Sequence, residues 1–217
     1  MLDTRVQPGA ALPPTPDMAH DPVRATQHIY RVLLDALSNP GITVPLVQHP
    51  HLAQEQALSQ PWLASVLLTL VDHETSLAVL PFPGHQLLVD AVQRRTRVEM
   101  TTVEVADFVV AEVASIPAGL PLHMNHGTLD YPNDGATLLL GTGAGLRSSG
   151  QELELSGPGI DGRRTLPLGE IPTELIEARN EAVSDYPLGI DLFLVDAGGT
   201  VTGLPRTTAV VIRDGEA

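Results

Sequence analysis

Arginine and hydroxyl residues come together near the end of the chain, in Leu204-Pro205-Arg206-Thr207-Thr208. Proline fixes its own φ and restricts the residue before it, so the backbone that presents Arg206 is held in place. A guanidinium makes two aligned hydrogen bonds to an oxyanion, and neighbouring hydroxyls add further donors. The segment therefore indicates a clamp in which Arg206 and Thr207 bind an oxyanion or phosphonate. The alternative, which the 26 acidic residues of the chain favour, is a structural ion pair between Arg206 and Asp191.

A second candidate for anion binding is the turn Gly157-Pro158-Gly159-Ile160, which directly follows a predicted strand. Two glycines around a proline fix a specific turn, and such a turn can present backbone N–H groups to an anion. Gly157 and Gly159 are therefore candidate ligand-binding residues. The same turn can also serve only to reverse the chain, and the sequence leaves both interpretations open.

Histidines supply the candidates for proton transfer and metal binding. Asp72-His73-Glu74 offers three adjacent ionisable residues, but adjacent side chains point in different directions, so these three cannot form a metal site alone. His73 is a candidate base or acid; alternatively, it is a polar residue that favours the negative end of a helix dipole. His123 and His126 have a spacing that suits a metal only on a helix, and proline and glycine flank them. No third ligand is evident, so we expect no metal site.

The run Gly141-Thr142-Gly143-Ala144-Gly145 resembles the opening of a dinucleotide-binding motif. That motif requires a helix to begin at once, and no helical pattern follows. Residues 146–150 lead instead into another predicted strand. The sequence therefore favours a hairpin loop over a dinucleotide site.

Composition excludes several classes of protein. The chain has 217 residues, of which 43% are hydrophobic, and its formal net charge is −14. It can form a packed core, and its acidity disfavours binding to nucleic acids. No apolar run is long enough to span a membrane, and the N-terminus lacks the apolar segment of a secretory signal. We expect a cytoplasmic protein that binds neither nucleic acid nor membrane.

Two residue types are missing. The chain has no cysteine, which excludes disulfides, thiolate metal sites and iron–sulfur clusters. All 12 basic residues are arginine, so the chain has no lysine for a P-loop or for a Schiff base with pyridoxal phosphate. We therefore expect no bound cofactor, and any phosphate or phosphonate must be held by arginine, histidine, hydroxyls or backbone N–H groups.

The elements that must position these residues alternate between helix and strand. Apolar spacing predicts helices at 22–37, 62–71, 84–95 and 172–184, and strands at 42–47, 76–80, 108–113, 136–140, 151–156, 190–195 and 208–212. Residues 1–20 are rich in proline and small residues and read as a flexible arm. The remainder, 21–217, is expected to form a single α/β domain with a mixed β-sheet flanked by helices.

Several stretches, in consistent order over residues 22–212, together resemble the PhnH family, a subunit of the bacterial carbon–phosphorus lyase system. They are Tyr30-Arg31-Val32-Leu33-Leu34-Asp35-Ala36-Leu37-Ser38-Asn39-Pro40-Gly41, Leu67-Leu68-Thr69-Leu70-Val71-Asp72-His73-Glu74-Thr75, Gly135-Ala136-Thr137-Leu138, Gly157-Pro158-Gly159-Ile160, Tyr186-Pro187-Leu188-Gly189-Ile190-Asp191-Leu192 and Leu204-Pro205-Arg206-Thr207-Thr208. The chain departs from the family in having Tyr30 and Tyr186 where the family usually has phenylalanine. The first 20 residues have no recognised counterpart.

This resemblance implies a fold similar to the large domain of pyridoxal-phosphate-dependent transferases, without the cofactor. It also implies a homodimer that joins partners resembling PhnG, PhnI and PhnJ in a core complex for phosphonate metabolism. That complex forms ribose 1-phosphonate 5-triphosphate from a phosphonate and ATP, before a radical subunit cleaves the carbon–phosphorus bond. A chain without cysteine cannot be the radical subunit.

Three functions remain open at this stage. The resemblance favours a structural or assembly subunit of a transferase and lyase complex, without an autonomous active site. Alternatively, the chain contributes part of the ribosyl-transfer site, with Arg206, Asp191 and His73 as catalytic candidates. A stand-alone hydrolase is the third function, and the absence of a Gly-x-Ser-x-Gly motif and of a metal triad argues against it.

Overall fold

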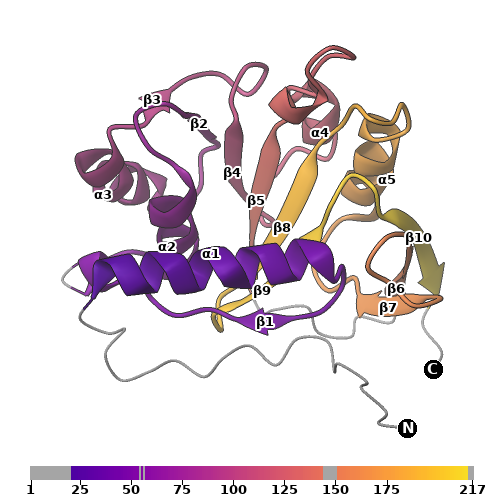
Figure 1. Ribbon diagram of the computed structural model, residues 1–217, viewed down its shortest axis with the longest axis horizontal. Helices are drawn as coiled ribbons and strands as arrows, with labels where there is room; N and C mark the ends of the chain where they lie inside the picture. Colours follow the sequence, from indigo (N-terminus) through magenta and orange to yellow (C-terminus); the bar gives the residue numbers. More distant parts are fainter. Residues whose placement is uncertain (1–20, 54, 56, 144–150, 215–217) are drawn as a thin grey trace, which may run out of the picture.

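A seven-stranded mixed sheet lies at the centre of the molecule, with strand order β1-β9-β8-β5-β4-β2-β3 (Figure 1). The computed structural model describes residues 21–53, 55, 57–143 and 151–214. The arm predicted for residues 1–20 lies outside these ranges. The elements are α1 (Pro22–Ser38), β1 (Val44–Pro45), η2 (Pro50–Leu52), α2 (Pro61–Leu70), β2 (Ser76–Val79), α3 (His85–Thr96), β3 (Glu99–Met100), β4 (Phe108–Glu112), α4 (Leu120–His123), η3 (Pro132–Asp134), β5 (Thr137–Thr142), β6 (Gln151–Ser156), β7 (Arg164–Pro167), α5 (Thr173–Ala182), β8 (Asp191–Asp196), β9 (Thr200–Leu204) and β10 (Ala209–Asp214).

In this sheet β9 runs in the direction opposite to the other strands, since it pairs antiparallel with both β1 and β8 while the remaining pairs are parallel. A separate antiparallel sheet has the order β10-β6-β7. Parallel strands are buried on both faces, which explains the nearly continuous apolar runs of β4, β5 and β8. The α/β class and the mixed sheet expected from the sequence are confirmed.

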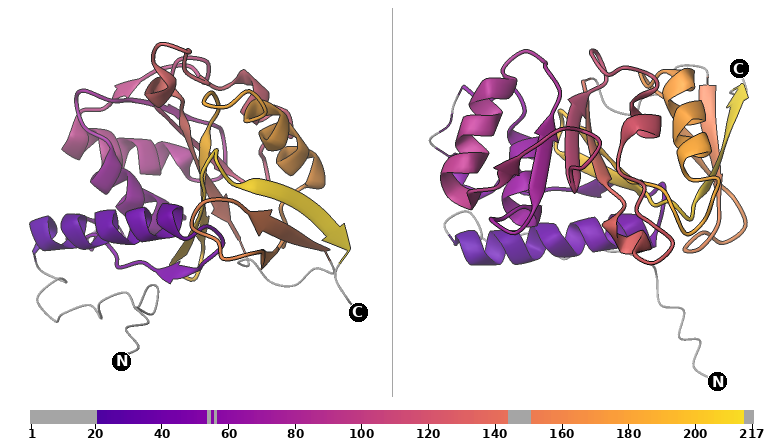
Figure 2. Two further views of the ribbon diagram at one scale, coloured as in Figure 1. Left: turned by 45° about the vertical axis from the view of Figure 1, so that its right-hand side comes forward. Right: turned by 90° about the horizontal axis from the view of Figure 1, so that it is seen from above.

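Helices cover both faces of the large sheet (Figure 2). On one face, α1, α2 and α3 pack over alternate strand residues such as Val110, Leu139 and Phe193. On the other face, α4, α5 and the small sheet pack over their neighbours, such as Leu138 and Leu192. Each strand therefore contributes side chains to two separate apolar clusters. No helix in the described part of the chain is both long and apolar enough to cross a membrane.

Helix α1 begins where the sequence indicates. The carboxylate of Asp21 accepts hydrogen bonds from the backbone N–H groups of Val23 (3.0 Å) and Arg24 (3.2 Å), and Pro22 occupies the first turn. One face of the helix buries side chains at steps of three and four residues, namely Ala25, Ile29, Val32, Leu33 and Ala36. This face lies against α2 and β9.

Gly203 allows α1 to approach the sheet closely. A Cβ atom built at this position in β9 would lie 2.6 Å from the carbonyl oxygen of Ala36 and 2.8 Å from the backbone nitrogen of Leu37. Both contacts are with helix backbone, which cannot rotate away as a flexible side chain does. The glycine therefore sets the distance between α1 and β9.

Two predictions about the strands are wrong in detail, and some strands were not predicted. Residues 136–140 and 151–156 were expected to flank a hairpin loop, but β5 pairs with β4 and β8, whereas β6 pairs with β7 and β10. The two strands belong to different sheets, and the connecting residues 144–150 lie outside the described ranges. The strand expected at 42–47 is only Val44–Pro45, because Pro45 has no N–H and the pairing stays at the sheet edge. Strands β3, β7 and β9 were not predicted.

Candidate functional site

Arg206 and Asp191 form an ion pair at one end of the large sheet. Arg206 lies in the turn between β9 and β10, and Asp191 is the first residue of β8. The backbone N–H of Arg206 donates to Asp191 Oδ1 (2.8 Å), its Nη2 donates to Oδ2 (2.8 Å), and its Nε lies 3.4 Å from Oδ1. The side chains are 13% and 23% exposed, so the pair is mostly shielded from water. This is the ion pair that the sequence offered as the alternative to an oxyanion clamp.

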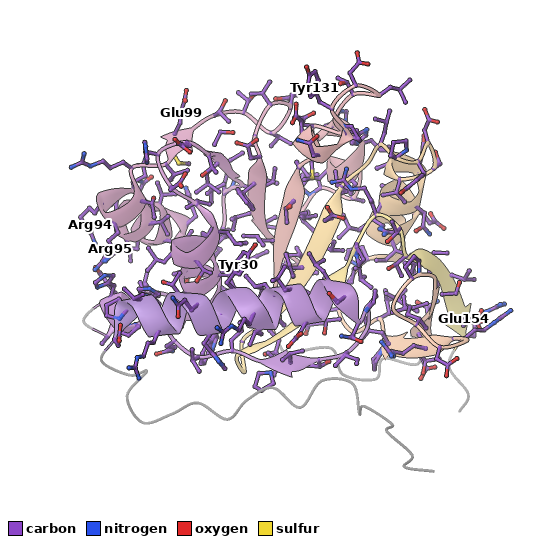
Figure 3. The ribbon with its side chains drawn as sticks, in the orientation of Figure 1. Tyr30, Arg94, Arg95, Glu99, Tyr131 and Glu154 are labelled. Carbon is purple, nitrogen blue, oxygen red and sulfur yellow. The ribbon has the colours of Figure 1, made fainter. Side chains whose placement is uncertain are left out.

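The remaining donors of Arg206 hold a neighbouring loop. Its Nη1 donates to the carbonyl oxygen of Pro132 (2.7 Å) and its Nη2 to that of Gly135 (3.3 Å). Pro132 follows Tyr131, which lies at the edge of the molecule where β5 and β8 begin (Figure 3). A guanidinium has five N–H groups, so these bonds and those to Asp191 leave Arg206 little capacity for an external anion.

The other predicted ligand-binding residues lie nearby. Thr207 is exposed. Gly157 follows β6 with φ of 134°, and a Cβ there would lie 2.9 Å from the carbonyl oxygen of Thr207. Gly159, with φ of 81°, packs against the carbonyl oxygen of Ser38 at the end of α1. Both glycines thus occupy backbone positions that other residues rarely adopt. Their role in ligand binding stays a prediction, as does that of Thr207.

His73 lies apart from this group. It is 72% exposed in the turn between α2 and β2, with Nε2 4.0 Å from Glu74 Oε1. The carboxylate of Asp72 accepts a hydrogen bond from the backbone N–H of Glu74 (2.9 Å), which closes the turn. Strands β4 and β5 separate β2 from β8, so His73 is about 14 Å or more from Asp191 along the sheet. The structure brings Arg206 and Asp191 together but leaves His73 outside their reach.

The two histidines three residues apart do not share a helix. The four-residue helix α4 ends at His123, and His126 follows it, with Nε2 2.7 Å from the carbonyl oxygen of Pro121. Across the described ranges, no group of three or more histidine, aspartate or glutamate residues is arranged to hold a metal ion. The glycine run also differs from a dinucleotide loop, since Gly141 and Thr142 belong to strand β5.

Among the described residues, one histidine is buried. His49 is 3% exposed; its Nε2 lies 3.1 Å from Thr26 Oγ1, and its Nδ1 accepts a hydrogen bond from the backbone N–H of His51 (3.3 Å). Burial, together with the nearby His51 and Arg95, lowers the pKa of His49 from 6.5 to about 4. The folded protein therefore holds this ring in its neutral form.

This burial predicts a loss of stability in acid. Because the pKa of His49 is lower in the folded state, the unfolded chain takes up the proton first as the pH falls below 6.5. Stability is complete above pH 6.5 and is lost progressively toward pH 4, by about 2 kcal/mol at pH 5. Urea unfolding of the wild type and of His49→Gln at pH 8 and pH 5 should show a smaller acid loss in the variant. Equal losses in both proteins would contradict the assignment.

A buried arginine was not identified from the sequence. Arg179 in α5 is 1% exposed and shares the buried face of the helix with Leu175 and Ala182. The i, i+4, i+7 spacing of these residues was a usable signal, since it places an arginine within an apolar stripe. Burial lowers the pKa of Arg179 to about 10, and the carboxylate of Asp191 opposes this shift.

Arg179 lines a cavity that also reaches the predicted ligand-binding residues. This space, here called the Arg179 cavity, has a volume of about 620 Å³ and lies between α5 and the segment that leads into β10. Its walls include Arg179, Tyr186, Arg206, Thr207 and Thr208. A cavity of this volume accommodates a small molecule or a protein side chain.

Comparisons with known proteins agree on one family. The family described as "Bacterial phosphonate metabolism protein (PhnH)" matches residues 18–211. HtxG of Stutzerimonas stutzeri, a proposed C-P lyase subunit protein, is 35% identical over 187 residues, which are 86% of this chain and 86% of that protein. The PhnH subunit of alpha-D-ribose 1-methylphosphonate 5-triphosphate synthase from Rhizobium meliloti (strain 1021) is 30% identical over 191 residues, which are 87% and 91% of the two chains. The similarity thus spans both sheets and the Arg206 segment.

Proposed function

Because this chain belongs to the PhnH family of bacterial phosphonate metabolism proteins, we propose that it is a subunit of a carbon–phosphorus lyase complex. In this role it supports the step that forms ribose 1-phosphonate 5-triphosphate from a phosphonate and ATP. The observation that carries the proposal is the family match over residues 18–211, together with two relatives that are aligned over most of their own length.

We propose an assembly role rather than an autonomous active site. The pair formed by Arg206 and Asp191 is saturated by internal hydrogen bonds, which fits a structural function. His73, the candidate base, is exposed and lies several strands away. Arg206, Asp191 and His73 therefore do not form a constellation that could activate a nucleophile without help from other chains.

The proposed partners are proteins that resemble PhnG, PhnI and PhnJ, in the cytoplasm, and a second copy of this chain. We further propose that residues 21–217 form one domain whose fold is like the large domain of pyridoxal-phosphate-dependent transferases. The mixed sheet with helices on both faces is compatible with that likeness. Light scattering of the purified chain, which has a mass of 23.0 kDa, distinguishes a dimer from a monomer.

Affinity purification of the tagged chain with the other three subunits tests the proposed function. A complex subunit remains bound to its partners through gel filtration, whereas a protein with an unrelated role elutes alone.

A further inference from the structure

The charge of Arg179 is held by neutral groups. Its Nη1 donates to the carbonyl oxygen of Thr208 (2.8 Å) and to Asn180 Oδ1 (3.2 Å), and its Nη2 donates to the carbonyl oxygen of Pro205 (2.6 Å). Among the described residues, Arg179 is the only buried arginine, and no aspartate or glutamate is buried. Buried charges are ordinarily paired with an opposite charge. Arg179 lacks such a partner at contact distance within the described residues.

The carboxylate whose charge acts on Arg179 is already engaged. Asp191 influences Arg179 through space, but both its oxygens accept hydrogen bonds from Arg206. Arg179 and Arg206 thus share a single carboxylate, which leaves one positive charge without compensation beside the Arg179 cavity. The whole chain carries a formal net charge of −14, so a positive cavity is an exception to its general character.

Two buried polar atoms at the walls of the Arg179 cavity also lack hydrogen-bond partners. Three buried side-chain polar atoms in the described residues have no partner, and two of these, Arg179 Nε and Thr208 Oγ1, belong to walls of this one cavity. Buried polar groups are almost always hydrogen-bonded, so a buried donor or acceptor without a partner calls for a physical explanation, such as a water, an ion or a ligand that it can bind. The exposed hydroxyl of Thr207 is also part of the cavity wall.

We propose that the Arg179 cavity is an oxyanion site that takes a carboxylate or phosphoryl group, with Arg179 as its source of positive charge. Arg206, which the sequence offered as a candidate for this role, is neutralised by Asp191. Thr207 makes the first contact with the ligand, and Thr208 donates from its hydroxyl after rotation about χ1, since Oγ1 does not reach solvent in the unliganded structure. A free anion and an acidic side chain of a partner protein share this chemistry.

Titration of the intact chain tests the site with free anions. We expect inorganic phosphate and methylphosphonate to bind at low ionic strength in calorimetry. Thr208→Val should weaken binding about tenfold without lowering the melting temperature, since the hydroxyl that it removes has no partner in the unliganded protein. Thr208→Ser should retain the affinity, and Arg179→Gln should abolish it. Arg31→Gln, which removes an exposed arginine on α1, is the control for net charge and should bind as the wild type does.

A second experiment, copurification with the other subunits, tests whether the ligand is a carboxylate of a partner protein. Only this experiment rests on the proposed function. If no free anion binds, the wild type, Arg31→Gln and Thr208→Ser should still copurify with the other subunits, whereas Thr208→Val should not. If the wild type itself fails to copurify, the proposed function fails and the anion titration alone decides. The proposed site would be wrong if Thr208→Val bound anions and assembled as well as the wild type does. It would also be wrong if the wild type bound no anion and Thr208→Val still assembled normally.

Discussion

Replacement of Arg206 by alanine is expected to lower the free energy of unfolding by about 3 kcal/mol, which corresponds to a fall in melting temperature of about 9 °C for a chain of this size. The substitution leaves the carboxylate of Asp191 without its partner in a mostly shielded position. It also frees the carbonyl oxygens of Pro132 and Gly135. Because these bonds join the η3 region to β8 and to the turn between β9 and β10, we also expect weaker assembly with other subunits.

A double-mutant cycle isolates the ion pair. Asp191→Ala alone leaves the guanidinium of Arg206 unpaired, so the double variant Asp191→Ala/Arg206→Ala should be less unstable than the sum of the two single variants. A functional role would give a different pattern, in which Arg206→Ala melts and assembles normally but fails to support growth on methylphosphonate. If stability, assembly and growth were all unchanged, both interpretations of Arg206 would be wrong.

Replacement of Gly203 by alanine should destabilise the protein by about 3 kcal/mol through a steric effect alone. The added methyl group would lie 2.6 Å from the carbonyl oxygen of Ala36, so α1 must move away from β9 or the strand must bend. The buried face of α1, which includes Ile29 and Leu33, would then lose part of its packing. Thermal unfolding followed by circular dichroism measures the loss.

Gly119 provides the matched control for this substitution. A Cβ at Gly119 meets no atom within 4 Å, and the φ of the residue is −80°, which any amino acid adopts. Gly119→Ala should therefore alter the free energy of unfolding by no more than about 0.5 kcal/mol. Equal stability of the two variants would show that the close approach of α1 and β9 does not constrain the fold.

The sequence predicted correctly those helices and strands that are determined by capping residues and apolar spacing within a short stretch of the chain. The start of α1 follows from Asp21 and Pro22, and the strand predicted at 151–156 coincides with β6. Strand β9 was not predicted because it is short and contains a glycine, Gly203. A glycine is required there because the backbone of α1, which is far away in sequence, lies too close for a side chain. The hairpin between β5 and β6 was predicted wrongly because sheet membership depends on long-range pairing, which local patterns do not encode.

In the candidate site, too, features that depend on local sequence were predicted and features that depend on long-range contacts were not. Arg206 was identified from its own neighbours, and Asp191 was named as an alternative partner, an ion pair that the structure contains. Arg179 was not identified from the sequence because an arginine in an amphipathic helix is usually exposed. Its burial depends on hydrogen bonds to the carbonyl oxygens of Pro205 and Thr208, which precede β10. Local sequence therefore indicated the ion pair, whereas the cavity arises only when α5 packs against β10 and the segment that leads into it.

Copurification from cells that express this chain together with partners resembling PhnG, PhnI and PhnJ tests the central claim most directly. With an affinity tag on this chain alone, we expect all four proteins to elute together in gel filtration, at a mass well above that of the chain by itself. Native mass spectrometry of that peak should contain this chain in a fixed ratio to the others. Elution of the tagged chain alone, while the other three subunits assemble without it, would contradict the proposed role.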